Sequence, residues 1–187
     1  YTFQNGKVGL KLVSGQVVLS STNGKAKIIY SHGDVILVGP STSIVIPVVK
    51  GNEKEMSLNY GKVRGVINKD GPLAGLKIRT PSAVAGVRGT DLFVSYNPSD
   101  VKTEVQVLRG EVEVKAQLQA TDQLSQKTID SIESKTYTVK THEKLTMEVI
   151  ENNSSVTSST TSASEAAAAN PPVVNTEIVR SSVEDLD

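Results

Sequence analysis

Cysteine and tryptophan are absent from this chain, and other aromatic residues are scarce. Its 187 residues include five Tyr and two Phe, so only 4% are aromatic. The absence of cysteine excludes disulfides, thiolate metal sites and a cysteine nucleophile. The core must therefore be built from Val, Ile and Leu, and together with 14 Gly this composition favours strands and turns over helices.

Long apolar runs and clusters of like charge are also missing. No apolar run approaches the ~18 residues that a spanning helix needs, so no membrane span is expected in this chain. The formal net charge is zero, but residues 151–187 hold six acids and one Arg, which leaves a mild positive surplus on residues 1–150. Because that surplus is dispersed, without an aromatic platform or a groove-binding helix, nucleic-acid binding is not expected.

Residue types used in catalysis do not form a recognisable constellation. His32 and His142 are the only histidines, and neither has a second metal ligand nearby in the sequence. Ser82 lacks both a companion histidine and the G-x-S-x-G turn of a nucleophile elbow. The paired acids Glu111 and Glu113 fall on the solvent side of a predicted strand. We expect a non-enzymatic protein without a metal or cofactor.

Short stretches of alternating apolar and polar residues recur along residues 1–150. The first is the stripe of Val8, Leu10 and Leu12, and each stripe ends at a turn signal such as Gly, Pro or Asn-Gly. Strands at such regular spacing, with no helical stretch between them, indicate an all-β body. We predict a compact multi-strand sandwich or solenoid-like roll of short, mostly antiparallel strands, followed by a flexible C-terminal tail.

Residues 79–96 carry the most unusual combination, R-T-P-S-A-V-A-G-V-R-G-T-D-L-F-V-S-Y. Pro81 holds Thr80 in an extended conformation, and the small residues that follow suit close approach of two backbones. Arg88 must reach solvent, pair with a carboxylate or donate to carbonyl groups, because a lone buried charge is too costly. Two interpretations follow: Arg88 fixes a crossing of strands, or it anchors a partner.

A second motif lies downstream, where Val105, Val107, Val112 and Val114 alternate with polar residues on either side of Gly110. This pattern predicts a hairpin with Arg109 and Gly110 at its tip, with one dry and one solvated face.

Together, the two motifs resemble the FecR-type domain. T-P-x-A-x-x-x-V-R-G-T-D-x-x-V occupies residues 80–94, V-x-V-x-x-G-x-V-x-V follows at residues 105–114, and a weaker G-x-V-x-L and a G-D precede them. The resemblance covers roughly residues 7–150. The residues that we assign to the motif, as structural determinants or partner anchors, are Thr80, Pro81, Ala85, Val87, Arg88, Gly89, Thr90, Asp91 and Gly110.

The resemblance implies a role in the bacterial envelope. FecR-type domains commonly transmit a signal from an outer-membrane receptor to a cytoplasmic sigma factor, through a helical anti-sigma region and a membrane span that this sequence does not show. Stand-alone relatives look more like scaffolds or adaptors. We therefore expect a scaffold or adaptor that binds a protein partner or assembles into a homo-oligomer. Sigma-factor regulation and peptidoglycan or glycan binding are the alternatives, although glycan sites usually need exposed aromatic platforms and Phe93 is expected to face inward.

Three segments follow from composition and from the resemblance. Residues 1–150 form the FecR-like domain, placed in the periplasm or envelope of a Gram-negative bacterium after export by a signal not present in this chain. Residues 151–172 are rich in Ser, Thr, Ala and Pro and are predicted to be a linker. Residues 173–187 alternate weakly; they dock on a partner or on the body, or else stay disordered, which is the outcome we expect without a partner. Within the domain, residues 117–135 are predicted to be a short helix or an insertion.

Overall fold

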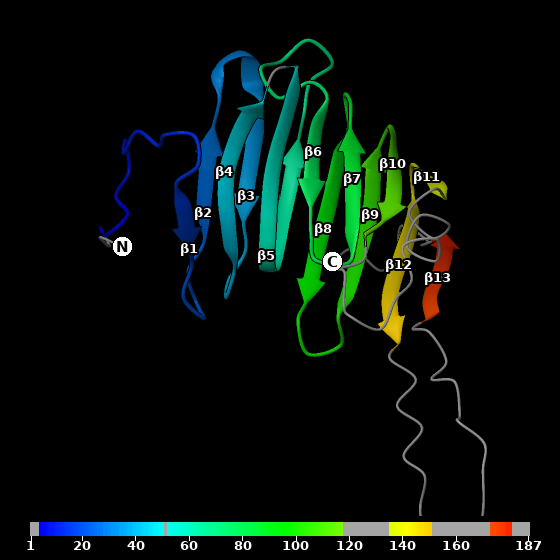
Figure 1. Cartoon of the computed structure of the whole chain (residues 1–187). Helices are drawn as coiled ribbons and strands as arrows, with labels where there is room; N and C mark the ends of the chain where they lie inside the picture. Colours follow the sequence, from blue (N-terminus) through cyan, green and yellow to red (C-terminus); the bar gives the residue numbers. More distant parts are fainter. Residues whose placement is uncertain (1–3, 51, 118–134, 151–172, 181–187) are drawn as a thin grey trace, which may run out of the picture.

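The computed structural model describes residues 4–50, 52–117, 135–150 and 173–180, and within them it is built almost entirely of strands (Figure 1). A three-residue 3-10 turn, Ser31–Gly33, is the one helical element of these residues. The strands are β1 Val17–Leu19, β2 Ala26–Ile29, β3 Val35–Val38, β4 Ser43–Lys50, β5 Glu53–Val66, β6 Leu76–Arg79, β7 Ala83–Val87, β8 Asp91–Asn97, β9 Lys102–Arg109, β10 Glu111–Ala116, β11 Thr136–Lys140, β12 Glu143–Ile150 and β13 Val173–Arg180. The all-β prediction is confirmed.

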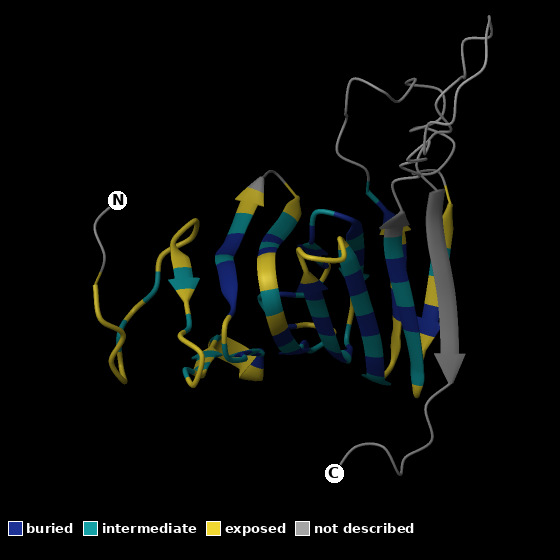
Figure 2. Cartoon of the chain, turned by 90° about the horizontal axis from the view of Figure 1, so that it is seen from below, coloured by how far each residue is buried: buried dark blue, intermediate teal, exposed yellow. Residues whose placement is uncertain are grey.

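The strands form one hydrogen-bonded sheet that is folded into two layers with the core between them (Figures 1 and 2). The first layer contains β1, β4, the first half of β5, β6, β7, β10 and β11. The second contains β2, β3, the second half of β5, β8, β9, β12 and β13. Among the described strands only β5 and β6 pair in parallel. The result is the predicted roll of short, mostly antiparallel strands.

β5 joins the two layers without a loop. Its first half pairs with β4 and β6, and from Gly61 onward it pairs with β3 and β8. Gly61 has φ +89°, and a Cβ added there would lie 2.3 Å from the Thr42 hydroxyl oxygen. That hydroxyl accepts a hydrogen bond from the Lys62 amide at 3.0 Å. Glycine is therefore required where the strand bends from one layer into the other.

Every second connection after β5 also crosses between layers, so the two strands that it joins lie in opposite layers. β7 leads to β8 through residues 88–90, and β11 leads to β12 through residues 141–142. β9 pairs with β8 and β12, whereas β10 pairs with β7 and β11. The predicted hairpin at Gly110 is thus wrong: both strands exist, but Gly110, with φ +90°, turns the chain from one layer to the other.

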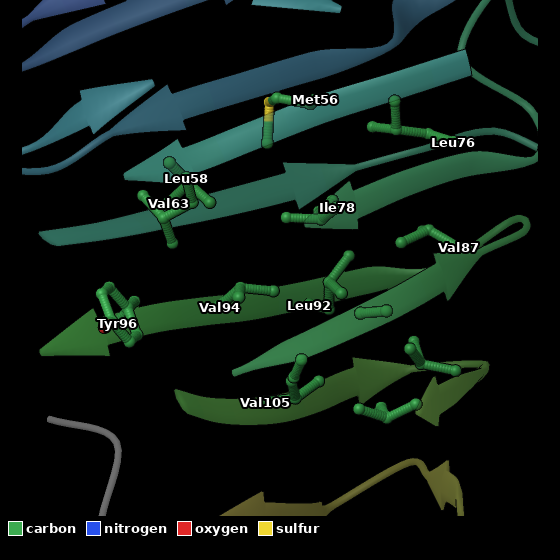
Figure 3. Close-up of a cluster of buried hydrophobic side chains, with 14 of the residues drawn as sticks. Met56, Leu58, Val63, Leu76, Ile78, Val87, Leu92, Val94, Tyr96 and Val105 are labelled. Carbon is green, nitrogen blue, oxygen red and sulfur yellow. The ribbon is translucent and has the colours of Figure 1, made fainter. Parts of the chain in front are cut away.

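Apolar residues at alternate positions of both layers fill the space between them. Figure 3 shows Met56 and Ile78 from the first layer with Leu92, Val94 and Val105 from the second, and all five are at most 1% exposed. The alternation predicted around Gly110 is confirmed, because β10 alternates strictly between exposed and buried residues.

Two details of the predicted pattern are wrong. The stripe of Val8, Leu10 and Leu12 forms no strand, and Val8 is fully exposed. Phe93 lies between the buried Leu92 and Val94 on β8 and is only partly buried, on the outer face of the second layer. The alternation of apolar and polar residues indicates which face of a strand is apolar. It does not indicate whether another part of the chain covers that face.

The T-P motif places a cluster of hydroxyl groups inside the core. Thr80, Ser82 and Thr103 are at most 2% exposed. The Thr103 hydroxyl, on β9 of the second layer, lies 2.6 Å from that of Thr80 and 2.7 Å from that of Ser82, which come from the turn between β6 and β7 in the first layer. The Thr80 hydroxyl also accepts from the Ala83 amide at 3.0 Å. Thr80 and Pro81 thus form a structural turn that is tied across the core.

β13 continues the second layer beyond β12, in antiparallel register from Glu143 opposite Arg180 to Ile150 opposite Val173. Residues 173–180 thus pair with the body, which is one of the outcomes that the sequence left open for this segment. The segments predicted as a linker, residues 151–172, and as a helix or insertion, residues 117–135, lie outside the described residues except at the ends of the second segment, as do residues 181–187.

Asp34 and Tyr30 lie where the hairpin of β2 and β3 meets the loop that follows β5. Asp34 is completely buried, and its carboxylate accepts hydrogen bonds from the amides of Asn68 at 2.8 Å and Leu73 at 2.7 Å. The Tyr30 hydroxyl is buried without a hydrogen-bond partner in the described part of the chain. Burial, and secondarily the negative charge of Asp34, raise the pKa of Tyr30 to about 12.

We predict that Thr103→Val destabilises the fold by about 1–3 kcal/mol, because it removes the partner of the buried Ser82 hydroxyl without changing side-chain volume. The control is Thr138→Val on the exposed face of β11, which should change the free energy of unfolding by no more than about 0.5 kcal/mol. Urea unfolding of both variants measures the difference. Equal losses would show that the hydroxyl cluster contributes nothing specific.

A second prediction concerns alkaline pH. The folded protein retains the Tyr30 proton up to a pKa of about 12, whereas an unfolded tyrosine loses it near a pKa of about 10. The contribution of protonated Tyr30 to the free energy of unfolding is therefore fully present below pH 10. It is lost as the pH rises toward 12, because the unfolded chain gives up this proton first. Between pH 8 and pH 11, Tyr30→Phe should gain roughly 0.5–1 kcal/mol relative to the unsubstituted chain, since partial exposure weakens the full effect. An unchanged difference in urea unfolding would contradict this.

Candidate functional site

A row of stacked turns forms one end of the roll and contains most of the V-R-G-T-D motif. We call it the corner ridge; it consists of residues 67–75, 88–90, 109–110 and 141–142. The Ile67 amide donates to the Thr90 carbonyl at 2.9 Å, which links the first two turns. The Thr90 hydroxyl lies 3.2 Å from the carbonyl oxygens of Arg88 and Glu111 and donates to them. The Thr141 hydroxyl in turn donates to the Gly110 carbonyl at 3.0 Å.

Glycine is required where neighbouring turns of the ridge touch. Gly89 has φ +66°, and a Cβ there would lie 2.2 Å from Cγ of Lys69 in the preceding turn. At Gly110, with φ +90°, an added Cβ would lie 3.1 Å from the Gly89 carbonyl oxygen. Thr90 is completely buried beneath these contacts. The residues Gly89, Thr90 and Gly110 therefore set the spacing of the ridge.

Arg88 does not fix a strand crossing, contrary to the first of our two interpretations. Its side chain is exposed at the corner, and in the described part of the chain its guanidinium has no hydrogen-bond or ion-pair partner. The cation that does stabilise the strands is Arg64, whose Nε and Nη2 bind the two carboxylate oxygens of Asp91 at 2.9 and 2.8 Å. The hydrogen bond to Asp91 raises the pKa of Arg64. Asp91 on β8 thus forms an ion pair with Arg64 on β5, whereas Arg88 is exposed at the surface.

The ridge carries a group of exposed cations, contributed by all four turns or the residues beside them: Lys69, Arg88, Arg109 and Lys140. None of these four side chains forms an ion pair with a described residue. Exposed acids, Asp70 and Glu111, lie among them. Several cations on the outer faces of the layers are paired, as in Arg79 with Glu55 at 3.0 Å, although Lys62 and Lys115 on these strands form no ion pair with a described residue. Unpaired charge gathered on a rigid edge is typical of an interaction surface.

The remaining motif residues have structural positions. Ala85 and Val87 are buried on β7 and pack in the core. Thr80 and Pro81 lie in the turn between β6 and β7, at the other end of that hairpin from the ridge. The motif thus joins a structural segment, residues 80–87, to the corner at residues 88–91, where Arg88 is exposed and Thr90 is buried.

Sequence reasoning missed the part that Asp34 plays in the ridge. Its two carboxylate oxygens hold the loop at residues 67–75 by accepting from backbone amides, and a Cβ on Gly71 would collide with them. The G-D pair at residues 33–34 is part of the weaker upstream match to the family, but the match does not indicate what Asp34 contacts. The signal in the sequence is an acid that follows a glycine and directly precedes an apolar strand.

An open hollow of about 600 Å³ lies away from the ridge, beside the bend of β5. Tyr60, Lys62 and Asn97 are among the residues that line it, and Tyr60 is 40% exposed. A single exposed ring on an open surface provides less stacking area than the aromatic platforms on which glycan sites usually depend.

Neither a metal site nor a spanning helix is found in the described part of the molecule. No group of three or more His, Asp or Glu there could hold a metal ion. Within the same residues, no helix is long and apolar enough to cross a membrane.

Comparison with known proteins gives one family and one related fold. The family model described as FecR protein matches residues 16–113. Two crystal structures, at 1.65 and 2.50 Å, of a protein described as a "putative anti-sigma factor" from Parabacteroides distasonis ATCC 8503 share the fold. Each is 15% identical to this chain with a TM-score of 0.56, and the match covers 71% of this chain and 55% of that one. No curated protein matches the chain.

The matched region contains the first sequence motif, the second motif except for Val114, the bend of β5 and three of the four turns of the corner ridge. The match spans about half of the length of the related crystal structures. Because that model matches more than half of the sequence, the chain belongs to the FecR protein family.

Proposed function

We propose that this chain is the signal-receiving part of an envelope regulator that controls a sigma factor, and that the corner ridge is the surface that contacts its protein partner. Membership of the FecR family is the observation that carries the proposal. The shared fold with a protein described as an anti-sigma factor supports it. Both findings favour signalling over the scaffold or adaptor role that the sequence suggested.

The ridge is suited to binding because its backbone is rigid and its cations are free. The turns are hydrogen-bonded to one another through Thr90 and Thr141, so little ordering entropy is lost on binding. The exposed guanidiniums of Arg88 and Arg109 each offer a planar fork that fits a carboxylate. The partner surface that fits this ridge is an acidic region of another protein in the periplasm.

A scaffold role remains the second candidate. It is favoured by the N-terminal end of the roll, where β1 and β2 pair on one side only among the described strands. Val17, Leu19 and Ile29 on these strands are more than half exposed. Such edges accept further strands in assemblies.

We predict that Arg88→Glu combined with Arg109→Glu abolishes signalling without unfolding the protein, because both side chains are exposed and unpaired in the described structure. Each change should alter the free energy of unfolding by no more than about 0.5 kcal/mol. The measurement is transcript abundance in a strain carrying the doubly substituted chromosomal gene, compared with a deletion strain. The two strains should show the same altered set of transcripts.

Lys115→Glu is the matched control, since Lys115 is also exposed but lies on β10 toward the other end of the strand from the ridge. This strain should behave like the parent. If deleting the gene leaves the transcripts of every sigma-factor regulon unchanged, the signalling proposal fails. If deletion changes these transcripts but the double substitution does not, the protein regulates a sigma factor through a surface other than the ridge.

A further inference from the structure

β13 occupies an edge of the second layer that is built to accept a strand. All eight residues of β13 pair with the eight residues of β12, without a register shift. On its other side, β12 pairs with β9 and contributes the buried Leu145 and Met147 to the core. The position of β12 is therefore set by the body, and β13 is added to an edge that already exists.

The chain between the two strands is much longer than this pairing requires. Ile150 and Val173 are directly opposite each other, so a hairpin loop of about two residues would join them. Residues 151–172 separate them instead. The entropic cost of closing a loop rises with its length, so each added residue weakens the pairing of β12 with β13 of its own chain.

The same contacts are available from a second copy. Its β13 has the identical sequence and fits the same edge in the same register, and the long connection lets it reach a neighbour. Among the described strands, β13 alone pairs with this edge of β12. We propose that two copies of this chain exchange β13 reciprocally, each β12 pairing with the partner's C-terminal strand. The exchange is independent of the proposed signalling function, and it places two corner ridges in one assembly.

Cysteine pairs test the exchange directly, because the chain has no cysteine of its own. Thr146 and Glu177 are directly opposite each other on β12 and β13. In the variant Thr146→Cys with Glu177→Cys, pairing within one chain gives a disulfide-linked monomer, whereas exchange gives a covalent dimer of twice the mass. The full-length variant is equilibrated, oxidised and run on a non-reducing gel.

The expected result is a covalent dimer whose fraction rises with protein concentration. A tethered strand has an effective concentration of roughly 1 mM or less, so dimer should grow from a minor species near 10 µM to the major species near 1 mM. The control pair is Ser95→Cys with Glu104→Cys, opposite each other on β8 and β9, which a short turn connects. It should form a disulfide only within one chain.

In a second variant, Asn-Gly replaces residues 151–172 between Ile150 and Val173. Asn-Gly is a sequence suited to a two-residue hairpin turn. Combined with the Thr146 and Glu177 substitutions, this variant should remain monomeric at every concentration. The proposal is overturned if the full-length variant with Thr146→Cys and Glu177→Cys forms only intramolecular disulfides. That result is expected if β13 always pairs with β12 of its own chain, or if another protein's strand replaces it there. Equal dimer from the short-linker variant, or no disulfide at all while the control pair oxidises, would also overturn it.

Discussion

The hydrogen bonding of each tight turn to the next is the interaction on which this structure depends. A chain that crosses between two layers must reverse direction within a few residues, and the polar backbone groups of each turn need partners next to an apolar core. Thr90 meets this need for two turns at once, because its buried hydroxyl bonds to the carbonyls of Arg88 and Glu111. Thr141 and Asp34 do the same at either side. Without such links the layers would have no common register.

The same stacking explains why the surface charge is distributed as it is. Residues on the outer faces lie beside neighbours on adjacent strands, so cations such as Arg64 and Arg79 find carboxylates at fixed positions. At the corner, Arg88 is exposed and forms no ion pair with a described residue. A rigid backbone and unpaired charge therefore occur together at the ridge. This combination is what links the fold to a role in binding.

The ends of the roll are its open positions. Within the described strands, the N-terminal end presents β1 and β2 with one neighbour each, and the C-terminal end of the second layer is extended by β13. In a stacked architecture, every interior strand is covered on both sides, so only terminal strands have an edge that another chain can use. Association of this protein with copies of itself is therefore expected at the ends, while the ridge runs along the side.

The sequence by itself determined the fold class, the family and the inward residues of most strands, because Leu92, Val94, Val105 and Val112 follow the two-residue period of a strand and the motifs lie in a specific order. Only the tertiary structure decided which strands pair. Gly110 reads locally as a hairpin tip, yet β9 and β10 belong to different layers. The roles of Arg88 and Asp91 were likewise decided by neighbours distant in sequence, since Arg64 on β5 takes the carboxylate and leaves Arg88 exposed. Periodicity reports which face of a strand is apolar; it carries no information about the strand that lies beside it.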